Sequence, residues 1–456
     1  MSVHFALWLS LLVVSACDSF VEVPPPDSQL NSGAVFADYT TATAAMKDIY
    51  AKMRDTGLLN GNLNGLTHLL GQYTDELTCH QNGIGTAEPF YTNTLTVTNT
   101  TVQELWSSAY SQIYAVNSVL EGVQNSTTLS DHQKKQLTGE ALFVRALLHS
   151  YLSGVFGGCP YVTSSDYQQN STVSRLSQQD VYFRCIADLE QSALLLSVDY
   201  LSADRFRPNQ SAAKALLARM YLYTSQWDAA SNAASAVLNE TSLYVWETDL
   251  DKTFLKNCTS TIWQFAVGGN FDNTQEGSLF VFDVGPPVTV SLSSLLYNSF
   301  ETGDLRKVQW IRSVTNGSQT WYHAYKYKQG TVGTATNECS IQLRLAEQYL
   351  IRAEARAHAG DLIGAQEDLN VVRNRAGLGN TTATTSSSLV VAVLKERQAE
   401  LFAEQGHRFF DLQRSGTLDV ALNAVKPGWS STDAFWPVPQ SELLINPNLL
   451  PQNDGY

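Results

Sequence analysis

Residues 343–372, LRLAEQYLIRAEARAHAGDLIGAQEDLNVV, have the pattern of two helices joined by a tight turn. Apolar residues recur at helical spacing, first up to Ala359 and then again from Leu362. Between these two runs stands Gly360-Asp361, a pair typical of a helix end followed by a new helix start. A single helical hairpin cannot bury its own apolar face. We therefore expect this one to stack on others.

A second stretch, residues 212–238, has the same organisation, with its turn at Ser225-Gln226. Both stretches carry small residues where their helices must approach closely: Ala215, Ala218, Ala353 and Ala355. Helical spacing also predicts helices over residues 39–54, 102–123, 133–151 and 178–196. The sequence thus predicts a mainly α protein, in which tetratricopeptide-like helical hairpins form a right-handed scaffold.

Two segments interrupt this helical pattern. Residues 241–340 are rich in Gly, Asn, Thr and aromatic residues, and Thr261–Val267 has the alternation of a short strand. Residues 71–101 are similarly irregular. Long loops on a rigid scaffold are where binding usually occurs, so we expect the functional site in these two segments.

The N-terminus has the features of an export signal followed by a lipid anchor. Phe5–Val14 is an apolar run too short to span a bilayer, and Val14-Ser15-Ala16-Cys17 resembles a bacterial lipobox. One departure is that no Lys or Arg precedes the run. We predict a signal peptide over residues 1–16, acylation of Cys17, and a proline-rich tether over residues 17–36.

Composition narrows the class of partner. The net charge of −14 argues against a nucleic acid, and only 16% of the 456 residues are charged. A polar, weakly charged surface suits a neutral polar ligand. Five cysteines follow Cys17 at wide spacing; burial as free thiols is the favoured interpretation, and a disulfide stays open.

Residues 394–416, LKERQAELFAEQGHRFFDLQRSG, carry the most specific motif. They resemble the signature ERxxELxxEGxRxxDLxRxG of the SusD/RagB family, the surface lipoproteins of Bacteroidetes glycan-uptake systems. The final residues NDGY resemble the family's ending, with Asp454 in place of its usual proline. Further segments resemble the family in the same order along the chain: residues 140–146, 156–162, 344–355 and 370–377.

The resemblance implies one SusD-like domain over residues 37–456. It would comprise helical repeats at about 102–240 and 342–406, a loop-rich insertion at about 241–340, and an irregular C-terminal segment over 407–456. It also implies a lipid-anchored protein on the outer face of the outer membrane. Such a protein binds a glycan and passes it to a SusC-like TonB-dependent transporter, without a cofactor, a metal or enzymatic activity.

Charged residues of the signature have two interpretations. Glu400, Arg408, Asp411 and Arg414 are close in sequence and suit either a catalytic carboxylate–arginine site or a buried ion-pair network. We favour the network, because buried charges are costly unless they are paired. It would fix the C-terminal segment to the repeats.

A sugar presents an apolar C–H face and a rim of hydroxyl groups, which aromatic and polar side chains bind respectively. Two stretches have both kinds: residues 75–93, which include Phe90, and residues 270–323, which include Trp310. Site residues vary with the glycan in the family, so none is transferred by motif. From these stretches we predict as ligand-binding residues Trp321, Tyr322, Tyr91, His80, Asn82 and Phe271. Trp106 and Trp263 lie within regular patterns and are predicted to be core residues.

Two alternatives to glycan binding remain open at this stage. The protein is a lid or adaptor for a transporter of peptide or glycopeptide cargo, or, less favoured, a glycoside hydrolase using carboxylates such as Asp75 and Glu76. No GxSxG, HExxH or glycine-rich phosphate loop is present. Asp272 and Glu276 are acidic enough for calcium, but their spacing matches no regular calcium site.

Overall fold

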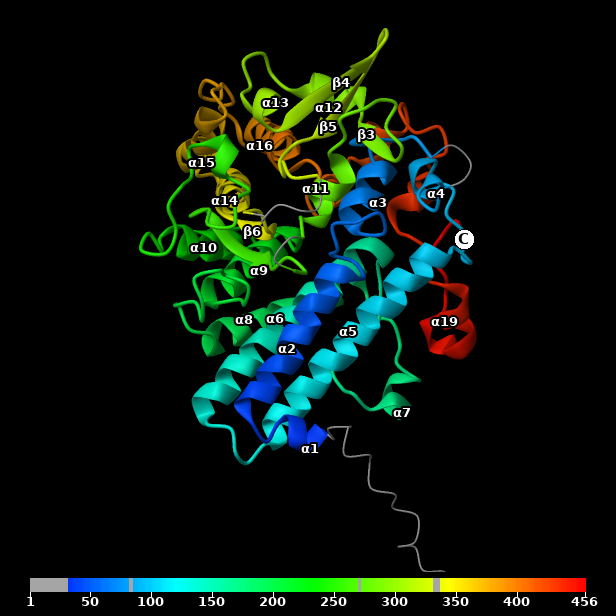
Figure 1. Ribbon diagram of the computed structural model, residues 1–456, viewed down its shortest axis with the longest axis vertical. Helices are drawn as coiled ribbons and strands as arrows, with labels where there is room; N and C mark the ends of the chain where they lie inside the picture. The colour runs from blue at the N-terminus through cyan, green and yellow to red at the C-terminus, as the bar shows by residue number, and fades with distance from the viewer. Residues whose placement is uncertain (1–31, 82–84, 270–271, 331–336) are drawn as a thin grey trace, which may run out of the picture.

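The computed structural model describes residues 32–81, 85–269, 272–330 and 337–456, and Figure 1 shows it as a ribbon. The predicted signal peptide, Cys17 and most of the tether therefore lie outside the described residues. The described chain is mainly helical, as predicted, and several of its short strands lie at one end of the molecule. None of the described helices is long and apolar enough to cross a bilayer.

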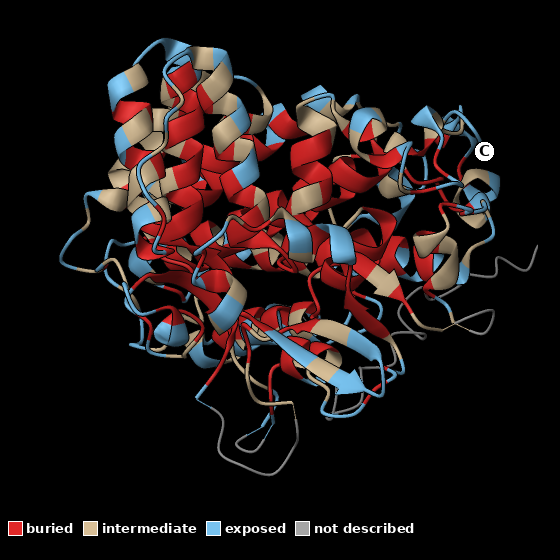
Figure 2. Cartoon of the chain, turned by 90° about the horizontal axis from the view of Figure 1, so that it is seen from above, coloured by how far each residue is buried: buried red, intermediate tan, exposed pale blue. Residues whose placement is uncertain are grey.

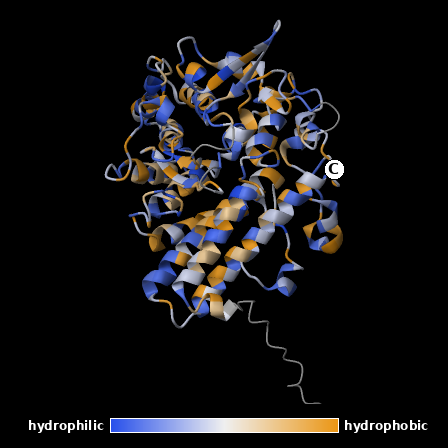
Figure 3. Cartoon of the chain, viewed as in Figure 1, coloured by the Kyte–Doolittle hydropathy of each residue, from blue (hydrophilic) through white to orange (hydrophobic). Residues whose placement is uncertain are grey.

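Long helices form the frame of the molecule. The N-terminal half contains α1 (Ser32–Val35), α2 (Tyr39–Asp55), α3 (Leu66–Tyr73), α4 (Glu88–Tyr91), α5 (Thr100–Asn125), α6 (Asp131–Phe156), α7 (Tyr167–Asn170) and α8 (Gln178–Leu195). Local sequence sets their limits: the Asn99 side chain caps α5, and Ser130 with Gln133 forms a capping box on α6. Gly157, at a φ of 71°, ends α6. Hydrophobic and hydrophilic residues alternate along α2 and α5 (Figure 3), because one side of each helix faces the core.

The two predicted hairpins are α9 (Gln210–Tyr223) with α10 (Trp227–Leu238) and α14 (Leu345–Ala359) with α15 (Leu362–Arg375). Gly360 ends α14 in the left-handed conformation, with a φ of 89°, and Asp361 caps α15. The helices α5, α6, α8, α9, α10, α14 and α15 pack in succession, so each hairpin covers its neighbour. α16 (Ser386–Leu401) also packs on α14. This stack confirms the predicted helical-repeat fold.

Short strands form two antiparallel sheets. The larger sheet has the order β1-β3-β5-β4 and consists of β1 (Leu77–Cys79), β3 (Val290–Leu292), β5 (Gln319–Ala324) and β4 (Ile311–Asn316). The smaller sheet pairs β2 (Thr261–Phe265) with β6 (Ser340–Arg344), and all of its residues are buried. The short helices α11 (Gln275–Phe280), α12 (Ser294–Ser299) and α13 (Arg306–Gln309) lie beside these strands.

The C-terminal segment is more regular than predicted. It contains α17 (His407–Arg414), α18 (Leu418–Leu422), α19 (Gln440–Ile445) and two 3-10 turns, Ser431–Ala434 and Pro447–Leu449. Gly406, just before α17, adopts the left-handed conformation with a φ of 75°. Phe409 and Phe410 of α17 are buried. Fully buried Trp436 packs edge-on against Phe90, with ring centroids 4.9 Å apart. The segment is thereby joined to the N-terminal part of the core.

Buried residues run continuously through the centre of the molecule (Figure 2). The largest apolar cluster joins α2, α5, α6 and α8 to the C-terminal segment, and a second one lies beneath the four-stranded sheet. Trp106 and Trp263 belong to the core, as predicted. The five cysteines after Cys17 are buried with free thiols, in agreement with the favoured interpretation.

Candidate functional site

Residues 77–79 and 290–324 come together in the four-stranded sheet, although they are far apart in sequence. Strand β1 pairs with β3 through Thr78 opposite Ser291, and β3 pairs with β5 through Leu292 opposite Tyr322. This pairing is the element that unites the two stretches in which we predicted the site.

The sheet separates Trp321 from Tyr322. Successive residues of a strand point to opposite faces, so Trp321 and His323 lie on one face of β5 and Tyr322 on the other. The register places Ser291 on the Trp321 face, because its neighbour Leu292 lies opposite Tyr322. The two adjacent residues predicted from sequence therefore cannot contact one sugar together.

Trp321 is partly exposed and lies against the loop of residues 281–289. A Cβ on Gly285 would lie 2.4 Å from the indole, so only glycine allows this close approach. The Asn316 amide donates to the carbonyl oxygen of Gly285 over 2.9 Å and ties the loop to the β4–β5 hairpin. The ring of Trp321 is thereby held in a defined orientation.

His80 belongs to the same face as Trp321. Its Nε2 lies 2.8 Å from the Ser291 hydroxyl, and its backbone N–H donates to the carbonyl oxygen of Thr289. Burial lowers the pKa of His80 below its usual value, so the imidazole is neutral at pH 7. Trp321 and His80 are partly exposed on this face, whereas Ser291 is buried and holds the His80 ring.

Tyr322 lies on the opposite face and stacks on Tyr297 of α12, with centroids 3.6 Å apart and ring planes at 14°. The ammonium group of Lys307 lies 3.9 Å from the centroid of the Tyr297 ring. One face of the Tyr322 ring is therefore already occupied by a protein side chain.

Tyr91 ends α4, which contacts β1. The Lys426 amine lies 3.9 Å from its ring centroid and donates to the carbonyl oxygens of Tyr91 and Gln72. Burial lowers the pKa of Lys426 to about 8.

Phe90 and Trp310, in the same sequence stretches, are fully buried core residues. The predicted site residues Asn82 and Phe271 lie outside the described residues.

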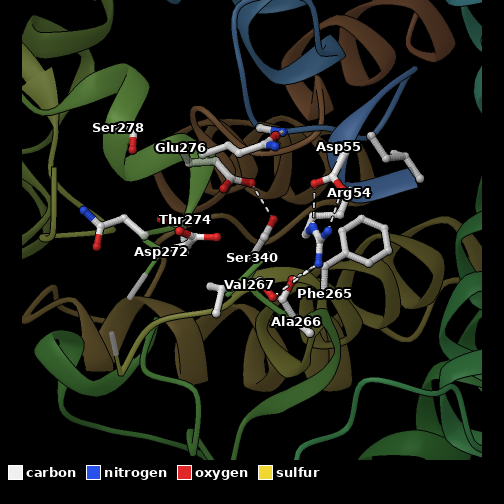
Figure 4. A pocket seen from close by; sticks show the side chains of 15 residues that line it. Arg54, Asp55, Phe265, Ala266, Val267, Asp272, Thr274, Glu276, Ser278 and Ser340 are labelled. Carbon is white, nitrogen blue, oxygen red and sulfur yellow. Dashed lines mark hydrogen bonds and ion pairs between the residues drawn. The ribbon is translucent and has the colours of Figure 1, made fainter. Parts of the chain in front are cut away.

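A cavity of about 230 Å³ lies where α2, β2 and α11 meet (Figure 4). Its lining includes Arg54, Asp55, Phe265, Asp272 and Glu276. Sequence reasoning missed the first three. Arg54 and Asp55 have the pattern of an ordinary helix end, and Phe265 that of a core strand residue. Only the packing of α2 on β2 brings them to the loop that holds Asp272.

Four of the described residues that line this cavity are charged: Arg54, Asp55, Asp272 and Glu276. Arg54 binds Asp55 through both its Nε and Nη2, at 2.6 and 2.5 Å, and its Nη1 donates to the carbonyl oxygen of Val267. Glu276 is only 4% exposed, and the Ser340 hydroxyl donates to its Oε1. Burial raises the pKa of Glu276. Among the described residues, no group of three or more His, Cys, Asp or Glu side chains is placed to hold a metal ion.

The remaining acidic residues that we singled out are engaged inside the protein. Asp75 forms a two-point ion pair with Arg408, and the buried neighbour Glu76 has its pKa raised to about 8, chiefly by burial. The charged residues of the signature belong to several buried ion-pair clusters and not to one network. Arg397 and Arg414 share Asp411, whereas Glu400 contacts Arg306, Arg344 and Arg375. These contacts agree with the structural interpretation of the motif.

Comparison with known proteins places the chain in a family. Residues 20–222 match a family model described as "Starch-binding associating with outer membrane", and residues 297–456 match the SusD family model. The SusD-like protein P2 of Formosa agariphila is 26% identical over 505 aligned positions, which cover 98% of each chain.

Solved structures show the same fold. A SusD superfamily protein of Bacteroides vulgatus is 22% identical and superposes with a TM-score of 0.81, covering 92% of this chain and 100% of its own. Surface glycan-binding protein A of Bacteroides uniformis is 20% identical with a TM-score of 0.77, covering 91% of this chain and 99% of its own. The matched family models and the full-length relative establish that the chain belongs to the SusD/RagB family.

Proposed function

We propose that the protein binds an oligosaccharide or polysaccharide at the cell surface and delivers it to a SusC-like TonB-dependent outer-membrane transporter. Membership of the SusD/RagB family supports this function, as does the fold shared with a surface glycan-binding protein. In this proposal the chain is a binding protein and not an enzyme, and the transporter supplies the energy for uptake. Lipidation of Cys17 and the tether that follows hold it to the outer membrane.

The face of the sheet that holds Trp321 is the observation that carries glycan binding. Trp321 offers a partly exposed ring against Gly285, and the partly exposed imidazole of His80, held by buried Ser291, lies on the same face. A sugar needs this combination, because its C–H face packs on an aromatic ring and its hydroxyl groups need polar partners. Tyr322, Tyr91, Asn82 and Phe271 remain predicted contributors, Tyr322 from the opposite face.

A binding screen tests the proposal. The chain from Asp27 onward would be titrated by calorimetry against soluble starch, laminarin, barley β-glucan and yeast mannan. We expect at least one saturable ligand. Trp321→Ala should weaken its binding at least about tenfold, because a central aromatic contact contributes about 2 kcal/mol or more.

Tyr167→Ala is the matched control. Tyr167 is an exposed aromatic residue, 74% accessible, in α7 at the far end of the molecule from the sheet (Figure 1). This variant should bind as the wild type does. Tyr322→Ala distinguishes the two faces of the sheet. If it lowers the affinity as much as Trp321→Ala does, the ligand does not bind only on the Trp321 face, and our assignment of the site to that face is contradicted. In cells, the Trp321→Ala chain should fail to restore growth of a deletion strain on the ligand at low concentration.

A further inference from the structure

The cavity between α2, β2 and α11 is separate from the Trp321 face and has features of a binding site of its own. Its walls come from the end of α2, the end of β2, the start of α11 and the start of β6 (Figure 4). Its volume of about 230 Å³ is below the roughly 300 Å³ at which sites for drug-sized ligands begin. A single sugar ring suits this space, and a chain of sugars does not.

Glu276 is the residue that gives the cavity its chemistry. Its side chain is buried, and the Ser340 hydroxyl, which accepts from the Gln342 amide, donates to Oε1. Oε2 has no hydrogen-bond partner in another described residue. A buried acceptor without a partner costs free energy, so the site favours a ligand that brings a donor.

The backbone makes room for this carboxylate. A Cβ on Gly61 would lie 2.3 Å from the Glu276 carboxyl carbon, so any larger residue at position 61 would displace Glu276. The Gly61 N–H donates to the side chain of Gln275, which holds the loop against the start of α11. The missing side chain at Gly61 leaves space for the Glu276 carboxylate, and the hydrogen bond to Gln275 keeps the loop beside it.

The charge of the lining selects the type of ligand. Among the described residues of the lining, Asp55, Asp272 and Glu276 are acidic, and the single cation, Arg54, is already bound to Asp55. Acceptors therefore exceed free donors, which favours hydroxyl groups and opposes carboxylated or sulfated sugars. Phe265 and Leu59 add apolar surface for a C–H face.

We propose that this cavity binds the terminal sugar ring of a neutral glycan, with hydroxyl groups of that ring donating to Glu276 and Asp272. The inference rests on the proposed function, since it names the part of the glycan that a second site receives. The Trp321 face binds the interior of the chain, and the cavity binds its end.

The test compares short and long forms of one glycan. Wild type, Glu276→Gln, Asp272→Asn and Trp321→Ala are each titrated with a polymer that binds in the screen and with the trisaccharide made from it. Glu276→Gln keeps the shape of the buried side chain, and Asp272→Asn keeps the shape of an exposed one. Asp199→Asn, another exposed aspartate, is the matched control.

We expect Glu276→Gln and Asp272→Asn to weaken trisaccharide binding at least about tenfold, the loss of one hydrogen bond to a charged group, and to weaken polymer binding less. Trp321→Ala should weaken the polymer most. Trisaccharide affinities within about twofold of wild type for both carboxylate variants would overturn the inference while leaving the proposed function intact.

Two further arms complete the experiment. Reducing the trisaccharide to its alditol shows which end enters: unchanged binding assigns the non-reducing end, and lost binding the reducing end. An acidic trisaccharide from pectin or alginate that binds more tightly than the neutral one would overturn the inference. If an acidic glycan binds the wild type and no neutral one does, the inference fails and the proposed function stands; if no glycan of either kind binds, both fail.

Discussion

Glu76 shows how one side chain can be neutral in the folded protein and charged in the unfolded chain. It is 2% exposed, next to Asp75, and one of its carboxyl oxygens has no partner among the described residues. Burial, followed by the charge of Asp75, raises its pKa to about 8 from a usual value of 4.5. The folded protein therefore keeps the Glu76 proton at a pH where the unfolded chain has lost it.

This difference predicts how stability depends on pH. The stabilisation from the raised pKa is complete below pH 4.5 and is lost as the pH rises to about 8. Glu76→Gln has no such proton, so wild type should lose roughly 4 kcal/mol relative to this variant between pH 4.5 and 8. Urea unfolding at both pH values measures it. Glu104→Gln, a change at an exposed carboxylate, should leave the wild-type profile unchanged. A Glu76→Gln profile parallel to wild type would contradict the assignment.

At the scale of elements, small residues set how closely the helical hairpins approach. Ala218 of α9, Ala230 and Ala234 of α10, and Ala355 of α14 form one buried cluster together with Ile351. All four alanines have no exposed surface. Larger side chains at these positions would push the two hairpins apart.

Ala355→Leu tests this packing. Overpacking a filled core costs about 1–3 kcal/mol, so the free energy of unfolding should fall by that amount. Ala359→Leu adds the same atoms at the exposed end of the same helix and should change stability by less than about 0.5 kcal/mol. The free energy of unfolding of both variants is measured in urea. Equal values would show that the interface between the hairpins is not tightly packed at Ala355.

On the scale of the whole molecule, a buried charge cluster ties distant parts of the chain together. Glu400 of α16 contacts Arg306 of α13, Arg344 at the end of β6 and Arg375 of α15. These arginines hold the pKa of Glu400 well below its usual range, despite burial. The cluster thus links the loop-rich part, the smaller sheet and the last hairpin.

Glu400→Ala should destabilise the protein strongly. Removing Glu400 takes away the carboxylate partner of buried Arg375 and one of the partners of Arg306 and Arg344, a loss of about 3–5 kcal/mol. Glu301→Ala is the matched control, because Glu301 also binds an arginine, Arg373, but its side chain is 36% exposed. Its effect should be below about 1 kcal/mol. Thermal unfolding followed by circular dichroism measures both, and a small loss for Glu400→Ala would mean that water enters the cluster.

Much of the fold follows from local sequence. Helical periodicity predicted the hairpins at 212–238 and 343–372, and Gly360-Asp361 predicted the turn of the second. Trp106 and Trp263 were assigned to the core from the patterns around them. The C-terminal helix α17 was not predicted, because its two buried phenylalanines are adjacent in sequence and its start depends on the conformation of Gly406.

The site was only partly predictable. Sequence reasoning named Trp321 and His80, but it could not place Tyr322 on the opposite face, because that depends on strand pairing. It also missed Arg54, Asp55 and Phe265, whose local patterns are those of ordinary structure.

The sequence by itself determined the family, the helical hairpins and the two stretches that carry candidate binding residues. Hydrogen bonds and apolar periodicity inside a helix join residues only a few positions apart, so a short window of sequence contains them. Only the tertiary structure decided which aromatic rings share a face, and that Glu276 meets the end of α2 in a cavity. These relations join residues far apart in the chain, and they exist only after the whole core has packed.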